Sequence, residues 1–246
     1  YLDNSATTRV DAQVQELMKK LMDVDFGNPS SRHQKGVVAE GYIKEARQKI
    51  AATLKVDPKE LIITSGGTES NNMALIGTAL AAKRKGNHII TTAVEHPSIK
   101  ATASFLEEQG FRITFLSVDS RGQISLEDLK EALTPDTILV SIMYVNNEIG
   151  TIQPVEEAAK LVHATVPGAV FHVDAIQAYG KVMIRPKQQG IDLLSVSSHK
   201  FHGPKGAGFL YCSSKVNLHP IIFGGGQQSG MRSGTENVPG AAGMGL

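Results

Sequence analysis

Short apolar runs alternate with segments of helical periodicity from residue 61 to residue 211. Continuous apolar runs of this length indicate strands that are buried on both faces of a sheet. We predict strands at 61–64, 88–91, 112–116, 138–142, 170–173, 193–196 and 208–211. Helices are predicted between them at about 69–84, 97–109, 126–133 and 155–163. The alternation predicts an α/β fold, with a mostly parallel sheet covered by helices on both faces.

Composition narrows the classes of partner. Hydrophobic residues make up 41% of the chain and charged residues 20%, as is typical of a water-soluble globular protein. The 25 basic and 24 acidic residues leave a net charge of +1, which gives no electrostatic reason to expect nucleic acid or a membrane surface as a partner. No apolar stretch approaches the length of a membrane span. Cys212 is the single cysteine, so no disulfide can form within the chain and we expect a cytoplasmic protein.

The two ends of the chain suggest a piece of a longer protein. The sequence begins at Tyr1, without a methionine, and stops at Leu246 shortly after an apparent helix start. We expect that the chain is cut at both ends, and by a wide margin at the C-terminal end. No repeat, low-complexity tract or linker divides residues 1–246, so we expect one large domain.

Polar groups follow five of the predicted strands. They lie in the segments Ser65–Thr68, Glu95–Pro97, Asn146–Glu148, Asp174–Gln177 and Ser197–Lys200. In open α/β sheets ligands bind beyond the carboxyl ends of the strands. We therefore expect these segments to meet at one edge of the sheet and to form a ligand site there.

The segment Ser197–Gly206 is the most specific of these signals. Lys200 comes directly after a buried strand, where its amine would be poorly solvated. Desolvation lowers the pKa of a lysine and suits it to Schiff-base chemistry. Ser197 and His199 could donate to a phosphate. The alternative is a solvated lysine in a turn rich in glycine and proline.

The turn Gly66-Gly67-Thr68 lies where a strand gives way to a helix. Exposed amides and the helix dipole would hold a phosphate there, with the Thr68 hydroxyl as a further donor. The alternative is an ordinary helix N-cap formed by Thr68. Neither the nucleotide phosphate loop nor the dinucleotide-binding glycine pattern matches this turn.

Asp174 and His96 are candidates for work on a cofactor ring. A carboxylate at a strand end, such as Asp174, can pair with a pyridine nitrogen; the alternatives are a helix cap or a structural ion pair. One helix-sized crossover separates Asp174 from Lys200, so we expect them on neighbouring strands. His96 can stack on a ring or move protons, although a lone histidine is often structural. His199 and His202 lack a further ligand, so no metal site is predicted.

A polar glycine-rich loop runs from Gly224 to Thr235. Its length without an apolar anchor apart from Met231 favours a functional loop over a simple connector. Its amides, with Arg232 and Thr235, could complete an anion site. The alternative is a disordered surface excursion.

Together these residues resemble the fold-type I pyridoxal-phosphate enzymes, and within them the aminotransferase class V group. The closest resemblance is to group-one cysteine desulfurases of the nitrogen-fixation and iron–sulfur-cluster type, and it runs from Tyr1 to Leu246. The motifs that carry it are Phe26–Ser31, Thr64–Ser70, Glu95-His96, Val145–Gly150, His172–Gln177, Gly203–Gly206 and Arg232–Thr235. The resemblance implies the cofactor-binding large domain, with about residues 1–10 belonging to a C-terminal small domain that is absent here.

The resemblance also implies residue roles. Lys200 would bind pyridoxal 5'-phosphate covalently and move protons, and Asp174 would pair with the pyridine nitrogen. Gln177 would bond the ring's phenolic oxygen, and His96 would stack on the ring as a candidate acid or base. The remaining roles are phosphate binding by Gly67, Thr68, Ser197 and His199, a place beside cofactor and substrate for Asn147, and contact of Thr235 with the other subunit's phosphate. The last role implies a homodimer with shared active sites.

The implied activity is removal of sulfur from L-cysteine, giving L-alanine and an enzyme persulfide for iron–sulfur clusters or tRNA thiolation. A sulfur-acceptor or scaffold protein is the implied partner. Cys212 does not match the family's sulfur-accepting loop cysteine, and that cysteine and the substrate-carboxylate arginine are expected beyond Leu246. We therefore expect this chain alone to be inactive. The alternatives are another class V enzyme (a selenocysteine lyase or an aminotransferase) and a non-catalytic pyridoxal-phosphate-binding fragment.

Overall fold

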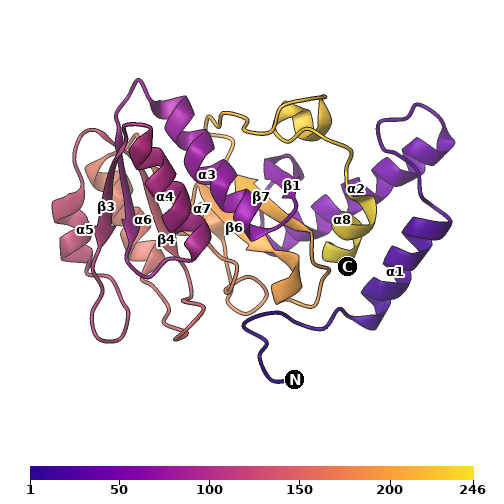
Figure 1. Ribbon diagram of the computed structural model, residues 1–246, viewed down its shortest axis with the longest axis horizontal. Coiled ribbons are helices and arrows are strands. Elements are labelled where there is room, and N and C mark those ends of the chain that lie inside the picture. Colours follow the sequence, from indigo (N-terminus) through magenta and orange to yellow (C-terminus); the bar gives the residue numbers. More distant parts are fainter.

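One seven-stranded sheet organises the fold in a computed structural model that describes all 246 residues (Figure 1). The strands are β1 (Leu61–Thr64), β2 (His88–Thr92), β3 (Arg112–Leu116), β4 (Thr137–Met143), β5 (Val170–Asp174), β6 (Leu193–Ser197) and β7 (Gly208–Cys212). Their order across the sheet is β1-β7-β6-β5-β4-β2-β3. Only β7 is antiparallel to its neighbours, so the other strands all end at the same edge.

Helices cover both faces of the sheet. The helices are α1 (Ala12–Asp23), α2 (Gln34–Leu54), α3 (Gly67–Ala82), α4 (Pro97–Glu108), α5 (Leu126–Ala132), α6 (Val155–Thr165), α7 (Pro186–Gln189) and α8 (Val238–Met244). Helices α3 and α4 pack together on one face, and α5 and α6 pack together on the other. The C-terminal helix α8 packs against the N-terminal helices α1 and α2 beside the sheet (Figure 1).

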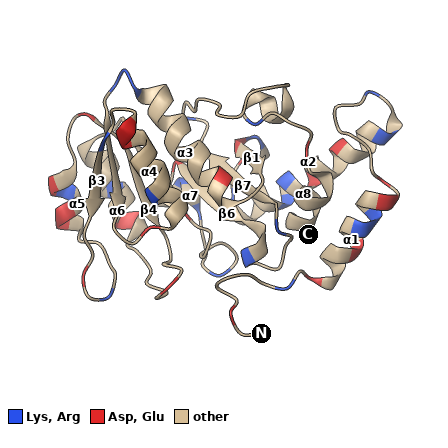
Figure 2. Cartoon of the chain, viewed as in Figure 1, with Lys and Arg blue, Asp and Glu red and all other residues tan.

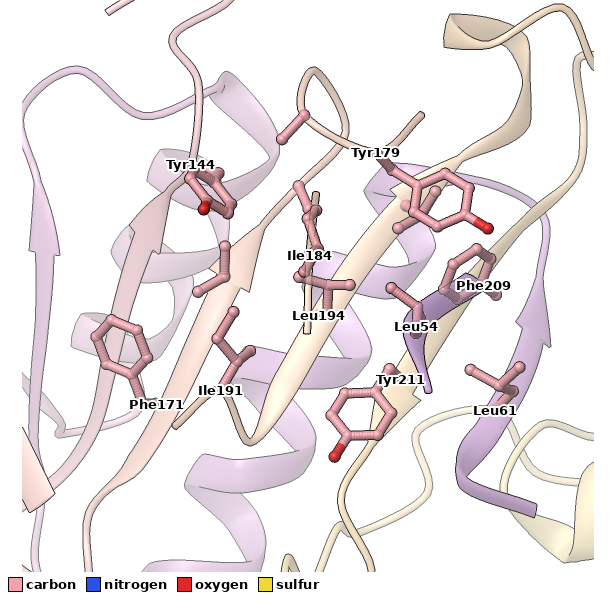
Figure 3. Close-up of a cluster of buried hydrophobic side chains, with 14 of the residues drawn as sticks. Leu54, Leu61, Tyr144, Phe171, Tyr179, Ile184, Ile191, Leu194, Phe209 and Tyr211 are labelled. Carbon is pink, nitrogen blue, oxygen red and sulfur yellow. The ribbon is translucent and has the colours of Figure 1, made fainter. Parts of the chain in front are cut away.

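Large side chains fill the core between the sheet and the helices. Phe171, Leu194, Phe209 and Tyr211 are fully buried on β5, β6 and β7, and Leu54 from α2 belongs to the same cluster (Figure 3). Burial of each such side chain contributes about 1.5–3 kcal/mol to stability. This packing holds β5 and β6 side by side as a rigid support for the residues at their carboxyl ends.

The predicted elements are largely confirmed. All seven strands lie within one residue of the predicted limits at each end, and the four helices lie within two residues. Helices α1, α2 and α7 were not predicted, although the buried α2 residues Ala39, Ile43, Ala46, Ile50 and Leu54 recur with helical spacing. The crossover from β5 to β6 holds only the four-residue α7 and a set of turns, in place of the full helix that was expected.

Charged residues of both signs are mixed along the outer helices (Figure 2). Helix α2, for example, carries the pairs Glu40–Lys44 and Glu45–Lys49, each one turn apart. Such exposed pairs contribute little to stability but leave no large surface of one charge. None of the helices combines the length and the apolar character that a membrane crossing would need.

Candidate active site

A cavity of about 450 Å³ lies at the carboxyl edge of the sheet. Nine of the ten predicted site residues line it: Gly67, Thr68, His96, Asn147, Asp174, Gln177, Ser197, His199 and Lys200. Their segments follow β1, β2, β4, β5 and β6, so the prediction that the polar strand ends meet at one edge is confirmed. The N-terminal residues Asp3, Ser5 and Ala6 complete the wall.

Asp174 is the last residue of β5 and is 4% exposed. Its Oδ1 accepts a hydrogen bond from the Ile176 backbone N–H at 3.0 Å, and its Oδ2 accepts one from Asn71 Nδ2 at 2.8 Å. None of the eight ion pairs in the structure includes Asp174, so the alternative of a structural ion pair is wrong. Burial raises the pKa of this carboxyl group. A buried acid without a cationic partner is suited to a ligand that brings a positive charge.

Lys200 lies in a short turn directly after β6, the strand that pairs with β5. The prediction that Lys200 and Asp174 follow neighbouring strands is therefore confirmed. The Lys200 Nζ donates to the carbonyl oxygens of Ser5 and Ala6 and has no carboxylate partner. Desolvation, and then the charge of Lys181, lowers the pKa of Lys200. A larger share of the amine is thus unprotonated, and hence nucleophilic, than in a solvated lysine.

His96 has a structural as well as a cavity-facing role. It is the N-cap of α4, and its Nδ1 accepts a hydrogen bond from the Ser98 backbone N–H at 3.1 Å. In the neutral ring the proton must then be on Nε2. Gln177 is similarly fixed, because its Nε2 donates to the Ser5 carbonyl oxygen at 2.8 Å. Both side chains line the cavity in a set orientation, which is what ring binding requires.

The start of α3 forms an open, amide-lined end of the cavity. The N-cap is Gly66, with φ 148° and no side-chain cap, so the alternative of an ordinary cap by Thr68 is wrong. The φ at Gly66 is one that residues with a side chain rarely adopt, so glycine is the residue suited to this turn. The free amides of this first turn, together with Thr68, Ser197 and His199 around it, suit a phosphate group.

Two contributors were missed by the sequence reasoning. Asn71 was not among the predicted site residues, yet it bonds both Asp174 and Ser98 from one turn into α3. The segment Ser5–Thr8 lies along the Lys200 turn, where the Thr8 backbone N–H donates to the His199 carbonyl oxygen at 2.9 Å. Asn71 comes three residues after Thr68, and this spacing could have predicted that the two lie on the same face of the helix. No local sequence pattern predicts the contact of the N-terminal segment with the Lys200 turn.

The glycine-rich loop is bonded to its own chain. Gln228 Oε1 accepts the Ile63 backbone N–H at 2.9 Å, and Arg232 Nε lies 2.8 Å from Glu69 Oε1. The alternative of a disordered excursion is thus not supported, and the prediction that Arg232 completes an anion site is wrong, because Glu69 occupies its guanidinium. Thr235 is exposed and does not line the cavity of its own chain.

Cys212 lies at the opposite edge of the sheet. It pairs with Leu193 at the start of β6, whereas Ser197 at the end of β6 lines the cavity. Four residues of strand separate these two ends by about 13 Å. Burial, followed by the charges of Glu60 and Asp192, raises the pKa of Cys212 to about 12. The thiol is therefore protonated, as predicted, and far from the cavity.

The model of the aminotransferase class-V family matches residues 1–246, the whole chain. The chain belongs to the aminotransferase class-V family. It is 51% identical over 244 residues to a putative cysteine desulfurase IscS 1 of Bacillus subtilis, covering 99% of this chain and 64% of that protein. It is 50% identical to the cysteine desulfurase IscS of Dictyoglomus turgidum, covering 100% of this chain and 62% of that protein. The chain thus spans somewhat less than two thirds of the length of these class-V relatives.

Solved structures of other proteins share the fold. A NifS-like protein superposes with a TM-score of 0.97 at 44% identity, covering 100% of this chain and 67% of the other. The structure of SspA in complex with cysteine gives a TM-score of 0.96 at 40% identity, covering 100% of this chain and 71% of the other. The prediction of a fold-type I pyridoxal-phosphate domain is confirmed.

Pyridoxal 5'-phosphate is the cofactor of this family, and the cavity fits it. Asp174 supplies a buried carboxylate without a cation, as a protonated pyridine nitrogen requires. Lys200 supplies an amine without a carboxylate partner, as covalent attachment requires. The free amides at the start of α3, with Thr68, Ser197 and His199 around them, match the phosphate end.

Proposed function

We propose that this chain is the cofactor-binding part of a cysteine desulfurase, which converts L-cysteine to L-alanine and leaves the sulfur as an enzyme persulfide. The proposal is carried by one observation. An unpaired buried carboxylate, Asp174, and a desolvated amine, Lys200, meet in one cavity of a chain that is about half identical to curated cysteine desulfurases. The persulfide would serve iron–sulfur cluster assembly or tRNA thiolation through a sulfur-acceptor protein.

Pyridoxal phosphate supplies an electron sink for the substrate's α-carbon when it is bound. The chain's residues bind and orient it and move protons. The buried carboxylate of Asp174 would hold the proton on the pyridine nitrogen, with Asn71 fixing the carboxylate in place. The Lys200 Nζ, free of a carboxylate, would attach to the cofactor and carry a proton at the α-carbon. His96, with its own proton on Nε2, would cover the ring, and Gln177 would donate to the phenolic oxygen.

The phosphate site would be made by backbone and hydroxyl groups. The amides of Gly67 and Thr68 at the start of α3, with the Thr68 and Ser197 hydroxyls and the His199 ring, surround one end of the cavity. Asn147 also lines the cavity, where its Nδ2 donates to Glu148 at 2.6 Å, and it would lie beside the cofactor and substrate.

The test is an assay of the full-length protein. L-Cysteine with a reductant should give alanine and sulfide in equal amounts over many turnovers. L-Selenocysteine, and an amino acid paired with a 2-oxo acid, are the comparison substrates for the lyase and aminotransferase alternatives. Preference for selenocysteine, or amino transfer without sulfide, would contradict the desulfurase assignment.

Replacement of Cys212 by serine should leave alanine formation by the full-length protein unchanged, within about twofold, because its protonated thiol lies at the far edge of the sheet. A polypeptide limited to residues 1–246 contains no other thiol, so it should bind the cofactor without catalytic turnover. Parallel alanine assays of wild type, Cys212→Ser and the 246-residue polypeptide check both points. Multiple turnovers by the short polypeptide that disappear in Cys212→Ser would show that Cys212 accepts the sulfur.

We propose a homodimer in which Thr235 contacts the phosphate in the partner's cavity. The proposal is supported by two observations: Thr235 is exposed, and it does not line the cavity of its own chain. The bonds from Arg232 to Glu69 and from Gln228 to Ile63 hold the loop in a defined shape before any partner binds. Sedimentation of the full-length protein should give a discrete dimer, and Thr235→Ala should weaken cofactor binding by about tenfold, as loss of one hydrogen bond to a charged group predicts. A monomer with full activity would overturn the proposal.

A cytoplasmic location is part of the same proposal. It is supported by the single cysteine, whose thiol cannot pair within the chain.

A further inference from the structure

Glu95 is a buried acid directly behind the cofactor cavity. It follows β2 and precedes His96, and its side chain is 2% exposed. It does not line the cavity, but Met143, which does, donates its backbone N–H to Glu95 Oε1 at 2.9 Å. The Thr92 hydroxyl donates to the same oxygen at 2.8 Å. The carboxyl group therefore links the last residue of β2 to the last residue of β4.

The two oxygens of Glu95 are used unequally. Oε1 accepts both hydrogen bonds, while Oε2 is fully buried without a partner. None of the ion pairs in the structure includes Glu95. An ionised carboxylate would leave a buried, unpaired charge, which is far more costly than a buried neutral acid. The pattern matches a neutral acid in which Oε1 is the carbonyl oxygen and Oε2 carries the proton.

A second carboxyl group nearby, that of Asp174, also favours the neutral form of Glu95. Met143 at the end of β4 is in register with Asp174 on β5. Glu95 therefore bonds the end of β4, and Asp174 lies beside the same end. Two charged groups act on the pKa of Glu95: Asp174 from β5 raises it, and Lys100 from α4 lowers it. Desolvation, followed by the charge of Asp174, raises the pKa of Glu95 to about 8. Two adjacent buried acids do not both ionise readily, and the ligand-facing one is Asp174.

We propose that Glu95 is a positioning residue that works as a neutral acid: it joins the ends of β2 and β4 behind the cavity and leaves Asp174 as the only negative charge beside the pyridine nitrogen. The inference rests on the proposed pyridoxal-phosphate function for its consequence, but the state of Glu95 is a property of the chain itself. Glu95 lies in the turn between β2 and α4. Asn146 also holds this turn, because its Nδ2 donates to the Val94 carbonyl oxygen at 3.0 Å. Through this turn Glu95 also sets the place of His96 at the cavity wall.

The direct test is carbon NMR of the full-length holoenzyme with glutamate labelled at the side-chain carboxyl carbon. One glutamate signal should show the protonated state at neutral pH and should titrate near pH 8. That signal should be missing in Glu95→Gln and, as a second assignment should the first variant fold poorly, in Glu95→Asp. Its absence from the wild-type spectrum at neutral pH would overturn the proposal whatever the variants do.

Kinetics test the positioning role separately. In Glu95→Gln the amide oxygen still accepts from Thr92 and Met143, so kcat for alanine formation should stay within about fivefold of wild type. In Glu95→Leu both donors lose their acceptor, and kcat should fall by about tenfold or more. The matched control is Glu107→Gln on the exposed face of α4, which should change nothing. A Glu95→Gln loss as large as that of Glu95→Leu would show that Glu95 works as an ionised group and would overturn the proposal. A wild-type protein without desulfurase activity would refute the proposed function, while the NMR result would still decide the state of Glu95.

Discussion

Replacement of Lys200 by alanine should reduce alanine formation by about four orders of magnitude or more. Two effects combine in this loss. The amine that attaches the cofactor is removed, and so is the only amine placed to move a proton at the substrate's α-carbon, a role worth about 10²–10⁴ in rate by itself. The hydrogen bonds of this amine are those to the carbonyl oxygens of Ser5 and Ala6, so the variant should still fold.

The measurements are the turnover rate of the full-length protein, the absorbance of its bound cofactor and borohydride reduction followed by peptide mapping. Reduction should attach the cofactor to Lys200 in the wild type and to no residue in Lys200→Ala. The control is Lys205→Ala, an exposed lysine five residues further along the same segment, which should keep both label and rate. A label on any other lysine of the wild type would contradict the assignment.

Replacement of Asp174 by asparagine should lower kcat by about one to two orders of magnitude. A hydrogen bond between charged groups is worth about 1.5–3 kcal/mol, and each 1.36 kcal/mol is a factor of ten in rate. Asparagine keeps the shape of the side chain but not the charge, so the pyridine nitrogen would lose its proton and the ring would withdraw electrons less strongly. The free energy of unfolding of the cofactor-free protein should not fall by much, because the loss of one hydrogen-bond acceptor is offset by the removal of a buried charge that has no cationic partner.

Steady-state kinetics and thermal unfolding of the two proteins check the Asp174 prediction. Asp192→Asn is a matched control, since Asp192 is also a largely buried acid that accepts a backbone N–H, from Phe171 at 2.9 Å, but precedes β6 at the opposite edge. It should leave kcat unchanged. Near-normal turnover in Asp174→Asn would show that another group tunes the ring.

The sheet and the cavity could be predicted because their signals are local. Each buried strand is a continuous apolar run, and parallel strands necessarily place the residues that follow them at one edge. From that geometry, residues as far apart in the sequence as Thr68 and Lys200 could be predicted to lie in one site, although their contacts were unknown. The pairing of Asp174 with Lys200 on neighbouring strands followed from the same rule.

The contacts that escaped prediction join segments with no shared local pattern. Lys200 meets Ser5 across 195 residues, and Arg232 meets Glu69 across 163. A charge in a glycine-rich loop is equally suited to an anion or to an acidic side chain, and only the folded position of Glu69 decides between them. The N-terminal helices α1 and α2 are a different case, since their apolar spacing was present in the sequence and was overlooked.

The order of the strands constrains how the chain can fold during its synthesis. The first strand to be made, β1, lies at the edge of the sheet and bonds only to the last, β7, with Leu61 opposite Tyr211. About 150 residues must therefore leave the ribosome before β1 has a partner, and contacts of such long range are associated with slow folding. Until then the apolar strand that leads into the Gly66 turn has no neighbour in the sheet, so a nascent chain that stalls before β7 should be held by chaperones or degraded.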